Sequence, residues 1–267
     1  MTRTLRFLCL LLTALGLFSC SVPQLSYFQG TEDGDILDLS GSEVIRLKPE
    51  DRISIIVNSK TPELAQLFNL PVYSKGITAS GAINTGYSVS SYTIAQDGTI
   101  DFPVLGKIQV AGLTRQEIAA NIKDDLIGRN LINDAVVTVE FVDMSFSVLG
   151  EVNRPGRYSI DRDNLTLLQA IGMAGDLTIN GLRENILVQR TVEGKMINYR
   201  LDITDLDELV KSPAYSIQQN DVIYVTPNDR KMRESTVNGN NVVSTSFWIS
   251  LSSLAVTIAN LIVNSIN

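Results

Sequence analysis

The last 33 residues of the chain, from Ser235 to Asn267, contain no charged side chain, and the final two dozen are rich in Leu, Ile, Val and Ala. A long apolar segment of this kind requires a membrane or an interface to cover it. Its polar residues recur at alternating steps of four and three positions: Ser246, Ser250, Ser253, Thr257, Asn260, Asn264 and Asn267. On a helix these seven residues form one narrow face, here called the polar stripe.

A helix over residues 246–267 would be about 33 Å long at ~1.5 Å per residue, close to the ~30 Å of a bilayer's hydrocarbon core. The sequence therefore predicts a membrane-spanning helix over residues 244–267, with several copies turning their polar stripes inward to line a pore. One alternative is a helix lying on the membrane surface, but such helices usually carry Lys or Arg on their polar face. A buried core helix is the other alternative. Residues 229–243 are expected to be the preceding linker.

The first 19 residues are expected to form a signal peptide, because Arg3 and Arg6 precede an apolar stretch over residues 7–18. The sequence LFSC at residues 17–20 is similar to the bacterial lipobox, in which the Cys is acylated and becomes the mature N-terminus. We therefore predict lipidation at Cys20, with residues 20–43 as an acylated tether. An ordinary cleaved signal peptide is the alternative.

Composition excludes several classes of protein. The chain has 267 residues, a formal net charge of -7 and no histidine. Without imidazole, Ser-His-Asp and Cys-His nucleophiles and His-ligated metal sites are excluded, and we expect no metal and no cofactor. The negative net charge argues against binding nucleic acid.

Two acidic pairs raise a carboxylate-based glycan hydrolase as an alternative: Asp97 with Asp101, and Asp124 with Asp125. The first pair begins with a turn signal, Asp-Gly, and the second is typical of an exposed helix face. We therefore predict no catalytic residue.

Between residue 44 and residue 228, alternating apolar residues and turn signals predict an α+β fold with two small mixed modules in series. In the first module, residues 44–143, the expected elements are a strand at 53–57, a loop or hairpin insertion at 77–91, a hairpin of 92–94 with 99–103, and a strand at 137–141. Its helix begins at the capping box of Thr114 and Glu117 and ends at Gly128.

The second module, residues 144–228, is predicted from the same kinds of signal. A strand at 144–148 precedes a turn at residues 154–156, and a helix begins at the capping box of Thr166 and Gln169 and ends at Gly175. Further strands are expected at 186–190 and 222–225. The membrane-spanning helix would follow these two modules.

Three segments resemble a known family. Residues 47–57, LKPEDRISIIV, are similar to the L-x-P-G-D-x-L-x-I-x-V opening of the polysaccharide export domain, with Glu50 where Gly is common. Residues 97–114, DGTIDFPVLGKIQVAGLT, resemble a later part of the same domain. Residues 150–158, GEVNRPGRY, with LLQAI at 167–171 and AG at 174–175, are similar to the SLBB β-grasp module. With the lipobox and the terminal helix, this ordered set resembles the Wza-like outer-membrane polysaccharide export lipoproteins.

The resemblance implies a lipoprotein in the outer membrane of a Gram-negative bacterium, anchored in the lipid at Cys20 with its modules in the periplasm. It implies a homo-oligomeric ring, commonly of eight subunits, with an α-helical pore for capsular or extracellular polysaccharide. It also implies an inner-membrane partner, a chain-length regulator or polysaccharide copolymerase. Longer members carry a second β-grasp module, whereas one is evident here.

Arg154 and Tyr158 of the β-grasp module are candidate glycan contacts, although turn and core roles would also explain them. A lipid-anchored glycan-binding or adaptor protein without a pore is the alternative to the exporter.

Overall fold

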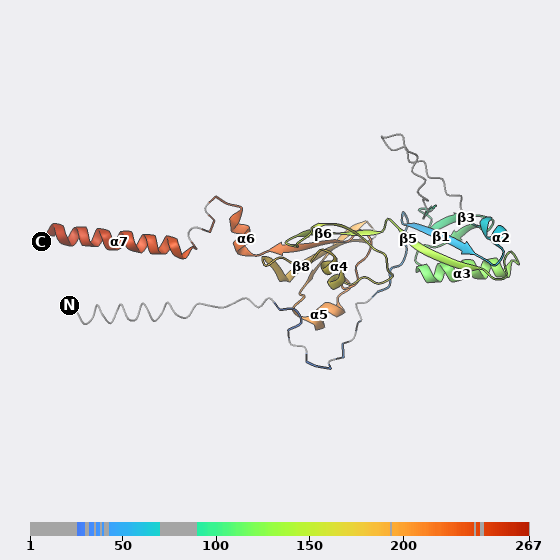
Figure 1. Ribbon diagram of the computed structural model, residues 1–267, viewed down its shortest axis with the longest axis horizontal. Coiled ribbons are helices and arrows are strands. Elements are labelled where there is room, and N and C mark those ends of the chain that lie inside the picture. Colours follow the sequence, from blue (N-terminus) through green and yellow to red (C-terminus); the bar gives the residue numbers. More distant parts are fainter. Residues whose placement is uncertain are drawn as a thin grey trace, which may run out of the picture.

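The computed structural model describes residues 26–29, 32–34, 36, 37, 39, 43–69, 90–192, 194–237, 239, 240 and 243–266. The predicted signal peptide, Cys20, Asn267 and all but the last two residues of the expected 77–91 loop lie outside this part of the chain. The described chain is elongated (Figure 1). The first module lies at one end, the second module lies in the middle, and the C-terminal helix lies at the other end.

The first module is built on a three-stranded antiparallel sheet of order β2-β1-β5, formed by β1 (Arg52–Asn58), β2 (Tyr92–Thr93) and β5 (Val136–Val142). The short helix α2 (Pro62–Gln66) follows β1, and α3 (Arg115–Gly128) packs on β5. Helix α3 buries the three residues predicted for its inner face, Ile118, Ile122 and Leu126. The predicted strands at 53–57 and 137–141 are confirmed.

The predicted hairpin of residues 92–94 with 99–103 is wrong in its pairing. Strand β3 (Thr99–Phe102) instead pairs with β4 (Gly106–Gln109), while β2 pairs with β1. The turn at Asp97-Gly98 does form, since Gly98 N–H donates to Ala95 O at 2.9 Å. However, the backbone of residues 92–94 is already paired with the first strand, so it is not available to β3.

Both predicted capping boxes are confirmed, because the side chain of each N-cap threonine and that of the residue three positions later exchange hydrogen bonds with the backbone. These boxes begin α3 and α4 (Leu167–Met173). The prediction that Gly128 caps α3 is wrong. Gly128 is the last helical residue, and the left-handed conformation falls on Asn130, with φ of 52°. Gly175, with φ of 77°, does follow α4 as predicted.

The second module is a five-stranded sheet of order β7-β6-β10-β8-β9. Its strands are β6 (Ser145–Gly150), β7 (Gly156–Ser159), β8 (Gly181–Val192), β9 (Lys195–Leu201) and β10 (Val222–Pro227). The neighbours β6 and β10 are parallel and the other pairs are antiparallel. The predicted strands at 144–148, 186–190 and 222–225 are confirmed.

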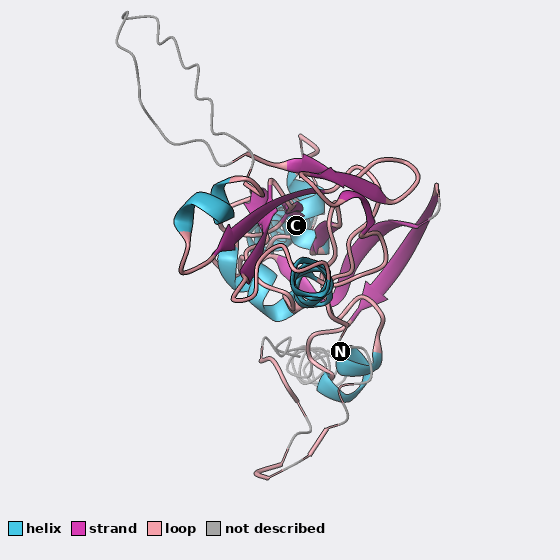
Figure 2. Cartoon of the chain, turned by 90° about the vertical axis from the view of Figure 1, so that its right-hand side faces the viewer, coloured by secondary structure: helices cyan, strands magenta, loops and turns pink. Residues whose placement is uncertain are grey.

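Six elements were not predicted from the sequence: β4, β7, β9, α2, α5 (Leu206–Lys211) and α6 (Asp229–Glu234). Strand β9 lies at the sheet edge and is exposed along most of its length, so its side chains show no clear alternation. Figure 2, seen along the length of the chain, shows helices and strands mixed within the modules, as the α+β prediction requires.

The C-terminal segment forms α7 (Thr245–Ile266), which confirms the predicted helix. Over the residues that the structure describes, however, no helix is long and apolar enough to cross a membrane. Among the described residues, the prediction that residues 244–267 span a membrane is therefore not borne out.

Gly150 at the end of β6 offers a test of the second module. Its φ is 87°, and a Cβ there would lie 2.1 Å from Val225 O. Gly150→Ala should lower the free energy of unfolding by more than the ~1–3 kcal/mol of a left-handed non-glycine residue, because the clash adds to the strain. Gly156→Ala is the control, since no atom lies within 4 Å of its Cβ position. Equal denaturant midpoints for the two variants would contradict this assignment.

Candidate functional site

An extended segment, residues 43–48, joins the two modules. The N–H groups of residues 43, 45 and 47 donate in turn to Ser216 Oγ, Asp163 O and Leu113 O at 2.9, 2.8 and 3.0 Å. Ile45 and Leu47 are each 1% exposed, so the alternate residues of this segment lie outside the core. The segment thus offers Arg46 and Lys48 to solvent from a backbone that both modules hold.

Arg115, the first residue of α3, strengthens the same junction. Its guanidinium donates to Asp163 of the second module at 2.6 Å and to Glu140 of β5 at 2.7 Å, and it lies 4.3 Å from the centre of the Phe141 ring. The hydrogen bond to Asp163 raises the pKa of the Arg115 guanidinium, so this cation stays charged. The two modules are therefore joined by backbone hydrogen bonds and by one shared arginine.

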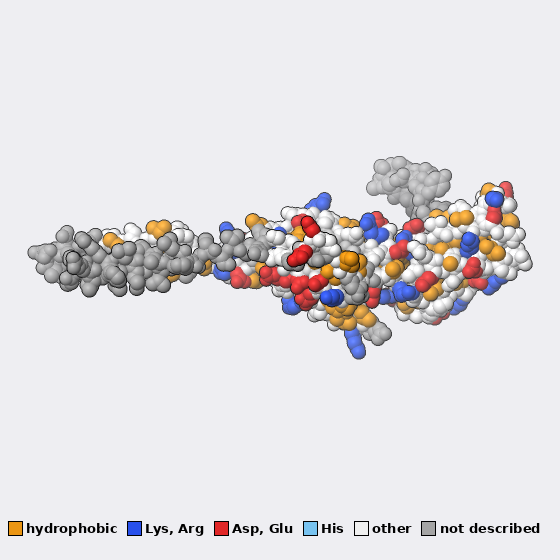
Figure 3. Space-filling model, turned by 90° about the horizontal axis from the view of Figure 1, so that it is seen from below, with side chains coloured by type: hydrophobic (Ala, Val, Ile, Leu, Met, Phe, Trp, Pro, Cys, Tyr) orange, Lys and Arg blue, Asp and Glu red, His pale blue; other side chains and the backbone are white. Residues whose placement is uncertain are grey.

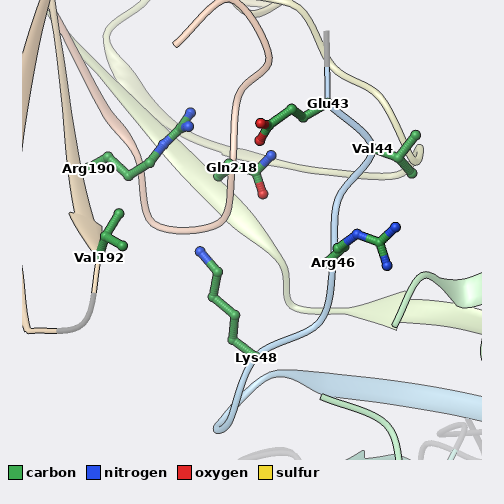
Figure 4. Close-up of a pocket in the computed structure, with 7 residues that line it drawn as sticks. All are labelled: Glu43, Val44, Arg46, Lys48, Arg190, Val192 and Gln218. Atoms are coloured by element: carbon green, nitrogen blue, oxygen red, sulfur yellow. The ribbon is translucent and has the colours of Figure 1, made fainter. Parts of the chain in front are cut away.

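A pocket of about 510 Å³ lies beside residues 43–48 (Figure 4). We call it the intermodule pocket, and its lining residues are Glu43, Val44, Arg46, Lys48, Arg190, Val192 and Gln218. Three of the seven side chains are cationic and one is anionic. The residues come from the joining segment, from the end of β8 and from the loop before β10, so no single stretch of sequence contains the site.

Arg190 is fixed in this pocket by a buried ion pair with Asp221, whose side chain is 0% exposed. Its Nε and Nη2 donate to the two carboxylate oxygens at 3.0 and 2.7 Å, and further N–H groups donate to the carbonyls of Pro213 and Ser216. The same carboxylate accepts the backbone N–H of Gln218 at 2.8 Å. This ion pair therefore holds one wall of the pocket in place.

The predicted tether, residues 20–43, contacts the second module at Tyr27 and Gln29, since Gln29 N–H donates to Thr204 O at 2.8 Å. The Tyr27 hydroxyl donates to Asp176, and the Arg183 guanidinium lies 5.6 Å from the centre of the Tyr27 ring. Burial, followed by the hydrogen bond to Asp176, raises the pKa of Tyr27 to about 12. Packing thus begins upstream of residue 44, which the sequence analysis did not foresee.

Of the two candidate glycan contacts, Arg154 lies in the turn before β7 and Tyr158 lies within β7. The Tyr158 hydroxyl donates to Arg154 O, and the Tyr158 ring stacks on Phe146 of β6 with centroids 5.7 Å apart. These contacts explain Arg154 and Tyr158 as residues that join the turn to the sheet. Tyr158 also lines a shallow hollow with Arg157, and its contact with glycan stays a prediction.

The polar stripe lies on α7. Ser246, Ser250, Ser253 and Thr257 are exposed on one face, and Thr257 Oγ1 donates to Ser253 O at 2.9 Å. The side chains of Asn260 and Asn264 and the whole of Asn267 lie outside the described residues. On the other faces, large apolar side chains are between 40% and 65% exposed: Phe247, Trp248, Ile249, Leu251, Leu254, Val256, Ile258 and Leu261.

Of the first acidic pair, Asp97 lies in the turn before β3 and Asp101 lies within β3. Asp97 accepts from the Thr99 hydroxyl at 2.6 Å, and hydrogen bonds from Thr99 lower the pKa of its carboxyl, which does not suit a general acid. Asp124 and Asp125 are neighbours on α3. Among the described residues, no group of three or more His, Cys, Asp or Glu side chains could hold a metal ion.

Comparison with known proteins identifies both modules. Residues 40–142 match the polysaccharide biosynthesis/export protein family, and residues 144–225 match the SLBB domain. The chain belongs to the Wza-like polysaccharide export proteins. This family is a family of export proteins and is not an enzyme family.

Two relatives of this chain carry the name "EPS I polysaccharide export outer membrane protein EpsA". The one from Ralstonia nicotianae is 36% identical over 155 residues, and the one from Ralstonia solanacearum is 32% identical over 154 residues. Each alignment covers 56% of this chain and 39% of the relative. The chain thus matches about two fifths of the length of these relatives.

The ion pair in the pocket wall predicts a large effect on stability. Asp221→Ala leaves the buried Arg190 charge unpaired, so the free energy of unfolding should fall by about 3–5 kcal/mol. Asp161→Ala is the matched control, because the pair of Asp161 with Arg162 is 70% and 52% exposed, and its denaturation midpoint should stay unchanged. Similar midpoints for both variants would show that Asp221 does not organise this wall.

Proposed function

We propose that this chain is an outer-membrane subunit for the export of capsular or extracellular polysaccharide, working as a homo-oligomeric ring. The observation that carries the proposal is α7, which exposes eight large apolar side chains around a regular polar stripe. A single copy leaves this surface in water, whereas side-by-side copies cover the apolar flanks and turn the stripes inward. The export family and the names of the two relatives support the same role.

The stripe has the chemistry that a sugar polymer needs. Hydroxyl and carboxamide groups exchange hydrogen-bond partners with water at little net cost, so a passage lined by them wets a glycan without trapping it. The average step along the stripe is 3.5 residues, which is the period of helices packed around a common axis. Passive conduction through this lining is the mechanism that we propose.

The rest of the assembly follows from the family resemblance. We propose eight subunits, lipid anchorage at Cys20, modules facing the periplasm, and an inner-membrane chain-length regulator or polysaccharide copolymerase as partner. The sequence contains no G-x-x-x-x-G-K-[ST] nucleotide loop, so the driving force would come from the partner machinery. On the face seen in Figure 3, positive and negative side chains are interspersed over the modules. The described part of this face therefore lacks the continuous basic patch that binding to nucleic acid or to anionic lipid would require.

The stripe is tested by making it apolar. Ser250→Leu, Ser253→Leu and Thr257→Leu together should reduce secreted polysaccharide to a small fraction of the wild-type amount, because the lining would no longer be wetted. Leucine favours helix, so α7 should persist. The control variant replaces three residues of the apolar surface conservatively: Ile249→Leu, Leu254→Ile and Ile258→Leu.

Secreted polysaccharide and helix content are measured for both triple variants in cells lacking the wild-type chain. Normal secretion by the stripe variant, with its helix intact, would refute conduction along the stripe. It would favour instead a lipid-anchored glycan-binding or adaptor protein without a pore.

The anchor is tested separately by metabolic labelling with a fatty-acid analogue. Cys20→Ser should abolish labelling and release protein from the membrane fraction, since a stable anchor requires the acyl chains. Cys9→Ser should label normally, because that residue lies within the predicted signal peptide. Labelling that persists in Cys20→Ser would contradict acylation at this position.

A further inference from the structure

The intermodule pocket lies away from the polar stripe, and conduction does not use it. Its volume of about 510 Å³ is within the ~300–1,000 Å³ of small-molecule sites. One side is the joining segment with Glu43 and Lys48, and the other is the end of β8 with Arg190 and Val192 (Figure 4). We infer that this pocket binds a carboxylate-bearing sugar unit, such as a uronic acid residue of the exported polymer.

The cations in the pocket differ in how far they are neutralised. Arg190 is paired with the buried Asp221, and Arg46 lies 3.1 Å from Glu117 and also donates to Gly112 O. Lys48 takes part in none of the ion pairs formed between described residues. Its side chain extends into the pocket (Figure 4), so its ammonium group is placed to receive an anion.

The remaining polar groups select the kind of anion. The carboxylate of Glu43 accepts hydrogen bonds only, and the carboxamide of Gln218 both donates and accepts, which suits sugar hydroxyls. A second negative charge on the ligand would be repelled by Glu43, so a singly charged carboxylate fits better than a phosphate. The methyl groups of Val192 offer an apolar wall to the C–H groups of a pyranose ring.

The pocket is held in position before any ligand arrives. Lys48 N–H donates to the buried Asp51 carboxylate at 2.8 Å, which fixes the backbone that carries the ammonium group. The backbone of Gln218 is fixed by Asp221, as described above. Binding therefore costs little ordering of the protein backbone, and the main loss is the freedom of the Lys48 side chain.

The experiment compares methyl glucuronide with methyl glucoside, which carries a neutral hydroxymethyl group in place of the carboxylate, by calorimetric titration of the full chain in detergent. The glucuronide should bind about tenfold or more tightly, the scale of one charge-assisted hydrogen bond. Lys48→Met keeps the apolar stem and should remove this preference. Lys123→Met, on the exposed face of α3, is the matched control and should retain it.

Equal affinity for the two sugars, no binding of the glucuronide, or an unchanged preference in Lys48→Met would overturn the inference. So would a Lys48→Met variant that alters only the mass of the oligomer, because the pocket would then be a contact with an acidic side chain of a neighbouring copy.

The inference depends on the proposed function only for the source of the sugar. If the stripe variant secretes normally while Lys48→Met loses the glucuronide preference, conduction fails and the sugar site stands. If the stripe variant blocks secretion and no sugar preference is found, the sugar site fails and conduction stands.

Discussion

The segment at residues 43–48 fixes the relation between the two modules. Its backbone hydrogen bonds reach both modules, and its inward residues, Ile45 and Leu47, belong to a core that runs through both. Arg115 adds a charged contact across the same junction. Because this segment is extended, every second side chain points away from the core. The backbone hydrogen bonds that join the modules therefore also place Lys48 beside the intermodule pocket.

The structure divides two tasks between its parts. The modules are closed by packed cores and by the buried pair of Arg190 with Asp221. Helix α7 differs, because the large apolar side chains that the structure describes on it are between 40% and 65% exposed. The modules therefore act as a rigid frame, and the helix supplies the surface through which copies would associate. The charged intermodule pocket on the modules would bind a sugar unit, whereas the neutral polar stripe of α7 would let the polymer pass.

Sequence reasoning succeeded where the signal is local. The capping boxes at Thr114 and Thr166 each depend on residues three positions apart, and both form as predicted. The pairing of β3 could not be predicted in the same way, because strands compete for partners across the whole module. The expected partner of β3 was β2, but β2 pairs with β1, and β3 pairs with β4. The pocket was missed because its walls come from residues 43–48, from residues 190 and 192, and from residue 218. The local signal was the alternation of apolar and cationic residues from Ile45 to Lys48.

The central claim is that copies of this chain assemble through α7 around a passage. The most direct test is the mass and shape of the full, acylated chain extracted in detergent, by light scattering and electron-microscopy class averages. We expect a discrete ring of several subunits with a narrow neck formed by the C-terminal helices, and loss of this ring when residues 244–267 are removed. A monodisperse monomer or dimer with acylation intact would contradict it.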